Sequence, residues 1–180
     1  IIGFRQGLAT QDAMKLVKSQ ILDSTTRGVK AILGLDLEKA FDNIRHSFIL
    51  QQISTLGLGQ RLHDYIRDFL SGRQASLRVG SLQSEPVALG NRGTPQGSVI
   101  SPTLFNLAML GLSRQLTRME NLQHTIYADD VTMWVAKGSE GQIERTLQNA
   151  IRTTEEYLKP TGLRCSPSKS ELLLYRPKKR

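Results

Sequence analysis

The sequence has a single cysteine, one tryptophan and no long apolar segment. A lone Cys165 excludes an internal disulfide framework and a zinc site built from several thiolates, so a reducing compartment is expected. No apolar run approaches the roughly 18 residues that a membrane helix needs, and no signal peptide opens the chain. We therefore expect an intracellular protein without a membrane partner. Because the first residue is Ile1, we expect the chain to be cut from a longer protein.

Acidic residues are the minority charge. Sixteen Asp and Glu stand against 24 Lys and Arg, which gives a net charge of +8. A positive field attracts polyanions, and nucleic acid is the commonest polyanion in cells. Ribosomal and heparin-binding domains share this balance, so the charge favours nucleic acid without establishing it. The hydrophobic fraction of 39% is ordinary for one soluble globular domain, and no linker divides the 180 residues.

Apolar periodicity predicts a mixture of helices and strands. Helices are predicted over residues 10–27, 42–57, 62–69, 101–119 and 139–160. Strands are predicted over residues 29–37, 75–79, 87–89, 125–135 and 172–175. Asp42 or Asn43 is expected to cap the second helix, and Pro160 to end the last one. Because no regular βαβ repeat is present, we expect an α+β fold with helices on one side of an antiparallel sheet.

Three carboxylates lie at the ends of apolar stretches. Asp36 closes the apolar run 31–35, and Asp129 and Asp130 interrupt the apolar stretch 126–131. An ionised carboxylate in such a place is costly unless a cation or hydrogen-bond donors compensate it. Adjacent residues on a strand face opposite ways, so both acids of the pair can serve one site only at a bend or hairpin tip.

Two strands that each deliver acid to one end suit a two-metal phosphoryl-transfer site. Magnesium takes oxygen ligands, usually a few carboxylates together with substrate phosphates. Two such ions can activate the attacking oxygen and stabilise the leaving one. Taken singly, Asp36 or the pair Asp129 and Asp130 is also what a helix cap or turn would contain. Spacing alone does not establish that the three acids converge.

Five segments in order resemble motifs of reverse transcriptases. Residues 127–130 (YADD) resemble the YxDD signature, and residues 36–42 (DLEKAFD) resemble the first catalytic motif. Residues 93–98 (GTPQGS) resemble the substrate-binding motif, residues 3–7 (GFRQG) the fingers motif, and residues 162–169 the motif after the catalytic hairpin. Residues 69–73 (FLSGR) with the strand behind them are similar to an insertion of non-LTR, LINE-type retrotransposon enzymes. Group II intron reverse transcriptases share much of this pattern and remain an alternative.

The resemblance implies the right-hand polymerase palm with part of the fingers. Residues 1 to about 30 and about 60 to 92 would belong to the fingers and palm insertions, and the remainder mainly to the palm. Because the sequence ends soon after Lys169, we expect no thumb within these residues. Weak or no polymerisation is therefore expected from these 180 residues alone.

The resemblance also implies a metal site and a proton donor. Asp36, Asp129 and Asp130 would be the catalytic carboxylates and, with the main-chain carbonyl of Leu37, the ligands of two Mg²⁺ ions, for which Mn²⁺ can substitute. Lys169 matches a lysine proposed to protonate the pyrophosphate leaving group. Residues 165–168 (CSPS) depart from the usual Asn-containing spelling of that motif.

The remaining implied roles concern the substrates. Phe41 matches the position under the sugar, where a ring would collide with a ribose 2′-hydroxyl and favour deoxynucleotides. Arg5 matches a residue that grips the triphosphate, and Tyr127 is expected near the primer end. The residues implied to line the nucleotide and template are Gly93, Pro95, Gln96 and Gly97.

The function implied is RNA-directed DNA synthesis in retrotransposition. A primer 3′-hydroxyl would attack a dNTP on an RNA template, in a two-metal nucleotidyl transfer. The implied partners are the RNA template, a DNA primer, dNTPs and the rest of the retroelement polyprotein, with an endonuclease and the thumb. Cytoplasm and nucleus are the expected locations. The other alternative is a catalytically silent, palm-derived nucleic-acid-binding module, which the presence of all three acids disfavours.

Overall fold

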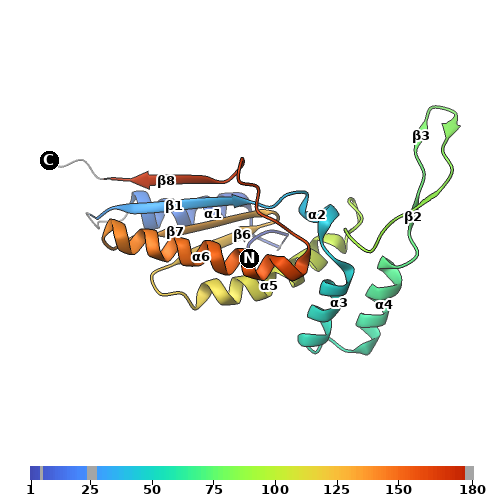
Figure 1. The fold of residues 1–180 in the computed structure, drawn as a ribbon, viewed down its shortest axis with the longest axis horizontal. Helices are drawn as coiled ribbons and strands as arrows, with labels where there is room; N and C mark the ends of the chain where they lie inside the picture. The colour runs from blue at the N-terminus through green and yellow to red at the C-terminus, as the bar shows by residue number, and fades with distance from the viewer. Residues whose placement is uncertain (5, 24–27, 177–180) are drawn as a thin grey trace.

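A four-stranded antiparallel sheet forms the centre of the molecule. The computed structural model describes residues 1–4, 6–23 and 28–176. The strands of the sheet are β1 (Lys30–Asp36), β6 (Gln123–Tyr127), β7 (Asp130–Val135) and β8 (Glu171–Tyr175), in the order β6-β7-β1-β8. Each neighbouring pair is antiparallel, so the two strands that carry the acids lie side by side (Figure 1). The predicted α+β class is confirmed.

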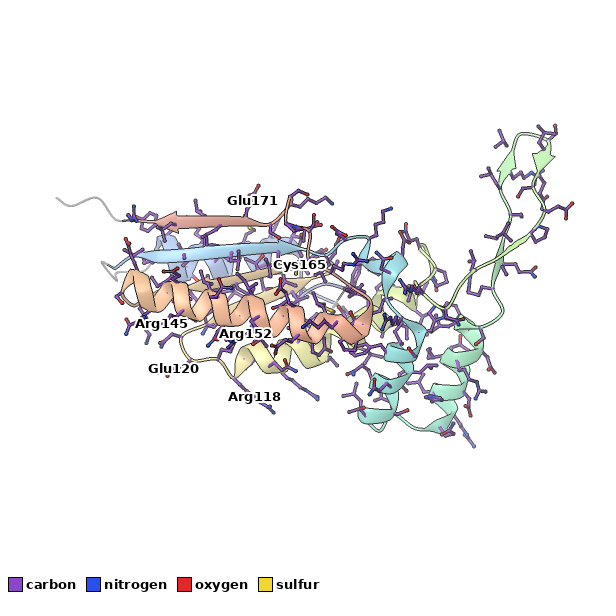
Figure 2. The ribbon with its side chains drawn as sticks, viewed as in Figure 1. Arg118, Glu120, Arg145, Arg152, Cys165 and Glu171 are labelled. Carbon is purple, nitrogen blue, oxygen red and sulfur yellow. The ribbon has the colours of Figure 1, made fainter. Side chains whose placement is uncertain are left out.

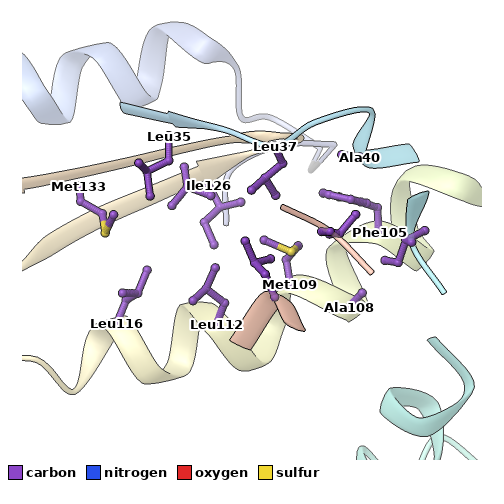
Figure 3. Close-up of a cluster of buried hydrophobic side chains, with 14 of the residues drawn as sticks. Leu35, Leu37, Ala40, Phe105, Ala108, Met109, Leu112, Leu116, Ile126 and Met133 are labelled. Atoms are coloured by element: carbon purple, nitrogen blue, oxygen red, sulfur yellow. The ribbon is translucent and has the colours of Figure 1, made fainter. Parts of the chain in front are cut away.

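Two long helices cover one face of the sheet. They are α5 (Ser101–Thr117) and α6 (Glu140–Thr161). Alternate strand residues point toward them, and this apolar cluster is the main core (Figure 3). Its fully buried members include Phe105, Met109, Leu112, Val131 and Met133. This packing fixes which strand residues are left to face the opposite side.

The opposite face carries the N-terminal helical segment. It is divided into α1 (Thr10–Val17) and a π-helix, η1 (Lys18–Leu22), whereas one helix over 10–27 was predicted; residues 24–27 lie outside the described residues. The π-turn makes tertiary contacts, because the Trp134 indole donates to Gln20 at 2.7 Å and Lys30 Nζ donates to the Ile21 carbonyl at 2.6 Å. Tertiary contacts of this kind can override a local helical pattern.

The segment after β1 forms two helices instead of the single one predicted. They are α2 (Ala40–Asn43) and α3 (His46–Thr55). The prediction that Asp42 or Asn43 caps the long helix is wrong, since α3 has Arg45 at its N-cap. The helix is interrupted between them because two of its carbonyls accept hydrogen bonds from the loop that precedes α5. Gly93 N–H donates to the Ile44 carbonyl and Thr94 N–H to the Phe41 carbonyl, both at 2.7 Å.

A protruding arm follows α4 (Gln60–Leu70), which packs on α3 through its apolar face. The arm consists of the short strands β2 (Gln74–Ala75), β3 (Arg78–Val79), β4 (Leu82–Gln83) and β5 (Val87–Ala88). β2 pairs with β5 and β3 with β4, and all eight residues are exposed. Figure 1 shows the arm standing away from the sheet and its helices.

The last long helix begins and ends by distinct local rules. Ser139, the residue at which this helix was predicted to begin, is its N-cap, with its hydroxyl accepting from Gln142 N–H. Pro160 does not end α6 as predicted but lies in its last turn, where only one backbone hydrogen bond is lost. Gly162, with φ +86°, provides the left-handed C-cap. Within the described ranges, no helix has both the length and the apolarity that crossing a bilayer requires.

Candidate active site

Asp36 and Asp130 face each other across two neighbouring strands. Asp36 is the last residue of β1, Asp130 is the first of β7, and the register pairs them directly. Their neighbours Leu35 and Val131 are also paired and point into the core beneath the sheet. Because side chains alternate along a strand, both carboxylates lie on the face turned away from α5 and α6. The sheet thus places two acids side by side at one end of its two central strands.

Asp129 lies on the tight turn that joins β6 to β7. Tyr127 pairs with Asp130, which leaves Ala128 and Asp129 as a two-residue hairpin loop. Ala128 adopts a left-handed φ of +53°, a region that such short hairpin loops use. The Asp129 carbonyl accepts a hydrogen bond from Leu37 N–H at 3.1 Å. This bond fastens the turn to the end of β1, so all three acids lie at one end of the sheet.

The environment of Asp130 includes the charges of the other two acids. Partial burial is the main cause that raises the pKa of Asp130 above its ordinary 3.8, and the negative charges of Asp129 and Asp36 add to it. Lys169 acts in the opposite direction. The Lys169 Nζ lies 3.4 Å from Asp36 Oδ1, which is ion-pair distance, but that oxygen makes no hydrogen bond within the described residues. The Lys169 ammonium therefore acts on Asp36 and on Asp130.

The loop that carries Lys169 is bonded to the end of β1. Ser166 N–H donates to the Asp36 carbonyl at 2.8 Å, and Glu38 N–H donates to the Arg164 carbonyl at 2.9 Å. Lys169 N–H then closes a turn on the Ser166 carbonyl at 3.2 Å. Leu37, buried between these bonds, also bridges to Cys165. The last of the five sequence segments is thus placed beside the first.

The chemistry of these donors suits a hard divalent cation. Carboxylate oxygens are the ligands that magnesium prefers, and the buried Asp36 Oδ1 has no hydrogen-bond partner in the described ranges. The side chains are not closed around a common point, however. No group of three or more His, Cys, Asp or Glu side chains in the described part of the chain lies close enough to hold an ion together. The Lys169 ammonium lies beside Asp36 in this arrangement.

An aromatic cluster lies next to the acids. Phe41, on α2, stacks on the buried Phe105 with ring centroids 4.8 Å apart. Phe4 meets Phe41 edge-on at 6.1 Å and stacks with Tyr127 at 6.2 Å. Phe4 belongs to the segment that resembles the fingers motif, but no role was predicted for it. The signal was missed because its two partners are 37 and 123 residues away in the sequence.

The loop before α5 packs against α2. Gly93 has φ +80°, and a Cβ added to it would lie 2.9 Å from the Asp42 carbonyl oxygen, so only glycine fits without displacement. Pro95 accepts from the Ser101 hydroxyl at 2.8 Å, and Gln96 Nε2 donates to Asp42 Oδ1 at 3.0 Å. Gly97 has φ +86° and open space around it.

A hollow of about 440 Å³ lies beside this loop. Its lining includes Asp42, Arg73, Arg92, Gly93 and Gln96, and none of the three acids. Three of the loop residues predicted to contact substrate, Gly93, Pro95 and Gln96, therefore line one cavity, next to but separate from the carboxylates, whereas Gly97 is not part of its lining. Arg5, the predicted triphosphate contact, lies outside the described residues.

The likeness to solved structures concerns the fold. Apo telomerase from Candida tropicalis, truncated from its C-terminal domain, superposes with a TM-score of 0.71 at 10% identity, covering 95% of this chain and 36% of that one. Telomerase from Candida albicans in complex with a telomeric RNA fragment superposes with a TM-score of 0.59 over 92% of this chain and 30% of that one, at 11% identity. The antiparallel sheet with its helices is accordingly the palm of the right-hand polymerase fold.

Sequence comparison gives the family. The family model described as reverse transcriptase (RNA-dependent DNA polymerase) matches residues 1–179. A 115 kDa protein of the retrotransposable element R1DM from Drosophila melanogaster is 32% identical over 96% of this chain. The RNA-directed DNA polymerase of mobile element jockey from Drosophila funebris is 31% identical over 73% of it. The chain belongs to the reverse transcriptase family, and its relatives are polymerases of non-LTR retrotransposons. It spans 16% and 15% of those two proteins.

Proposed function

We propose that this chain is the catalytic palm of an RNA-directed DNA polymerase that serves the retrotransposition of a non-LTR element. The observation that carries the proposal is the direct pairing of Asp36 with Asp130 beside the Asp129 turn. Three acids at one end of the sheet, with the Lys169 ammonium nearby, leave a negative site. Such a site suits cations and the phosphates that the cations bind. We assign the activity to a longer protein that contains this chain, comparable in length to relatives such as the jockey polymerase.

The carboxylates would hold the metal. Asp36, Asp129 and Asp130, with the Leu37 carbonyl, are the proposed ligands of two Mg²⁺ ions, which when bound would lower the pKa of the primer hydroxyl and neutralise charge on the phosphates. The turn bond from Leu37 N–H to the Asp129 carbonyl supports this set, because it fixes the relative position of the two strands that supply it. The catalytic contribution of the protein is then mainly positioning and electrostatics.

Lys169 is proposed to act on the leaving group. Its ammonium lies beside Asp36, and its side chain is exposed enough to reorient toward a bound triphosphate. From there it would donate a proton to, or hold charge on, the departing pyrophosphate. The bonds that fasten the Ser166 turn to β1 support this role by keeping the lysine near the acids.

The nucleotide contacts are proposed from the aromatic cluster and the loop before α5. Phe41 would lie under the sugar and exclude a 2′-hydroxyl, which gives a preference for dNTPs. Tyr127 would lie near the primer end, and Arg5 would grip the triphosphate. The proposed loop contacts to nucleotide and template are Gly93, Pro95, Gln96 and Gly97, of which the first three line one cavity.

The domain organisation follows the same reading. Residues 1 to about 30 and about 60 to 92 would be fingers and palm insertions, and the rest mainly palm, with the thumb and an endonuclease elsewhere in the parent polypeptide. The exposed arm over β2 to β5 supports the placement of an insertion there, because it adds nothing to the palm core. The partners would be an RNA template, a DNA primer and dNTPs.

The test is incorporation of dTTP on poly(rA)/oligo(dT) with Mg²⁺ by the parent-length protein. Asp36→Asn and Asp129→Asn should each lower kcat/KM by at least roughly a hundredfold, since each removes a proposed metal ligand. The matched control is Asp68→Asn, an exposed acid of α4 far from these two carboxylates, which should leave kcat/KM unchanged. A parent protein that binds the primer-template without extending it would instead be a palm-derived binding module.

A further inference from the structure

We infer that Phe4 is a positioning residue that holds the Phe41 ring in place and so helps to set the preference for deoxynucleotides over ribonucleotides. The inference rests on the proposed function, because it needs Phe41 to lie under the nucleotide sugar. Phe4 touches both Phe41 and Tyr127 in the described structure. It acts through Phe41 and needs no contact of its own with substrate.

The segment before Phe4 is fixed against the catalytic turn. Ile2 N–H donates to the Ile126 carbonyl at 2.8 Å, and Asn106 Nδ2 donates to the Gly3 carbonyl at 2.7 Å. A Cβ added to Gly3 would lie 2.8 Å from the Ala128 nitrogen, a distance that real side chains do not reach. The N-terminal segment is therefore pressed onto the turn that carries Asp129, and Phe4 has little freedom to move away.

The conformation of Phe4 itself is unusual. Its φ is +57°, in the left-handed region that non-glycine residues rarely occupy. Nearly half of the residue, 49%, is exposed, so burial in the core does not account for a large apolar ring at this position. The left-handed conformation of Phe4 places its exposed ring against Phe41 and Tyr127, two residues of the candidate site. A strained conformation with this result indicates a role for Phe4 at that site.

Phe41 depends on tertiary contacts for its position. It lies on α2, a helix of four residues that is too short to be stable alone. One side of its ring stacks on Phe105, and Phe4 meets it edge-on from another element. Both arrangements are among the favoured geometries for aromatic pairs. Removal of Phe4 leaves Phe41 with one of its two ring partners, so its χ angles should sample a wider range.

A looser ring should discriminate less well. A 2′-hydroxyl is rejected because the Phe41 ring cannot yield to it, whereas a 2′-hydrogen needs no such barrier. Loss of Phe4 should therefore favour UTP relative to dTTP. A residue that only stabilised the fold would change the two rates by the same factor, which makes the ratio of the two the diagnostic quantity.

The experiment measures kcat/KM for single additions of dTTP and UTP on poly(rA)/oligo(dT) with the parent-length protein. In Phe4→Ala we expect the dTTP-to-UTP ratio to fall by about three- to tenfold, the scale of one aromatic pair. Phe4→Tyr keeps the ring and should restore the ratio. Phe4→Leu keeps apolar bulk without the ring and should behave like Phe4→Ala. Tyr65→Ala removes an aromatic ring of similar exposure on α4 and should leave the ratio unchanged.

The double variant Phe4→Ala/Phe41→Ala separates the routes. If Phe4 acts through Phe41, its loss should change the ratio no further once Phe41 is alanine. Two results would overturn the inference without contradicting the proposed function. One is an equal loss of kcat/KM for dTTP and UTP in Phe4→Ala. The other is the same change of the dTTP-to-UTP ratio on loss of Phe4 whether residue 41 is Phe or Ala. A wild-type protein that adds neither nucleotide would refute the proposed function, and the inference with it.

Discussion

Asp36 and Asp130 stand directly opposite each other on antiparallel strands, as a like-charged cross-strand pair. Such a pair is unfavourable in a sheet, and here the register places it beside a third acid, Asp129. The pKa of Asp130 is raised mainly by its partial burial, and the negative charges of Asp129 and Asp36 raise it further. A bound cation would relieve the repulsion between these carboxylates. Without one, the arrangement lowers the stability of the fold, and such a loss of stability is common at functional sites.

Asp130→Asn should make the metal-free protein more stable at neutral pH. Removal of one charge of the pair should raise the free energy of unfolding by a few tenths of a kcal/mol. The raised folded-state pKa means that the folded protein holds this proton more tightly, so the cost arises as the carboxyl ionises and is absent well below its ordinary pKa of 3.8. Urea denaturation at neutral and at acidic pH should show the gain only at neutral pH.

The same variant should respond less to magnesium. Mg²⁺ should raise the melting temperature of the wild type by binding the folded acids, and raise that of Asp130→Asn by a smaller amount. Asp68→Asn, which alters an exposed acid of α4, should respond like the wild type. Equal shifts in all three proteins would show that magnesium stabilises through some other site.

Lys169→Ala should lower kcat without much change in stability. The Lys169 side chain is 67% exposed and its ammonium is only at ion-pair distance from Asp36, so the pair contributes little to folding. If Lys169 acts on the leaving pyrophosphate, kcat should fall by about tenfold to a hundredfold, with a smaller change in KM. Lys169→Arg keeps the positive charge, so it should retain the part of the rate that depends on charge stabilisation. Equal kcat in wild type and Lys169→Ala would refute the role.

Gly93→Ala should destabilise the domain more than Gly97→Ala. Both glycines have a positive φ, so each substitution strains the backbone by about 1 kcal/mol. At Gly93 the new methyl would also lie 2.9 Å from the Asp42 carbonyl oxygen, whereas nothing lies within 4 Å at Gly97. We expect a total cost of about 2–3 kcal/mol at Gly93, measured as the loss in free energy of unfolding. Equal costs would mean that α2 moves away freely.

Local sequence patterns predicted those parts of the fold that depend on local rules. The helices predicted to begin at residues 101 and 139 do so, because Pro102 and the capping box at Ser139 act within one turn. The break between α2 and α3 was missed, because the Gly93 loop that takes the Ile44 carbonyl is 49 residues away in the sequence. The π-turn of η1 was missed for the same reason.

In the candidate site, too, local patterns predicted some features and tertiary contacts determine the others. Interrupted apolar runs identified Asp36 and the hairpin acids, but only the register shows that Asp36 meets Asp130 rather than Asp129. Phe4 carried no pattern of its own: its position depends on a glycine fit and on bonds to β6 and α5. Motifs can thus identify residues, while the cross-strand pairing and ring contacts between distant segments are properties of the folded chain.

Cys165 should be nearly inert to alkylation in the folded protein. It lies where the chain leaves α6 and turns back toward β8 (Figure 2), and burial, with a smaller contribution from Glu155, raises its thiol pKa from 9.0 to about 11. The thiolate is the reactive form, so a shift of this size lowers its population near pH 8 by about a hundredfold. Iodoacetamide should modify the folded domain at least that much more slowly than the urea-unfolded chain. A comparison of the rate at Cys165 by peptide mass spectrometry, with Cys165→Ser as the unlabelled blank, tests this, and similar rates in both states would show that the loop at Leu37 opens readily.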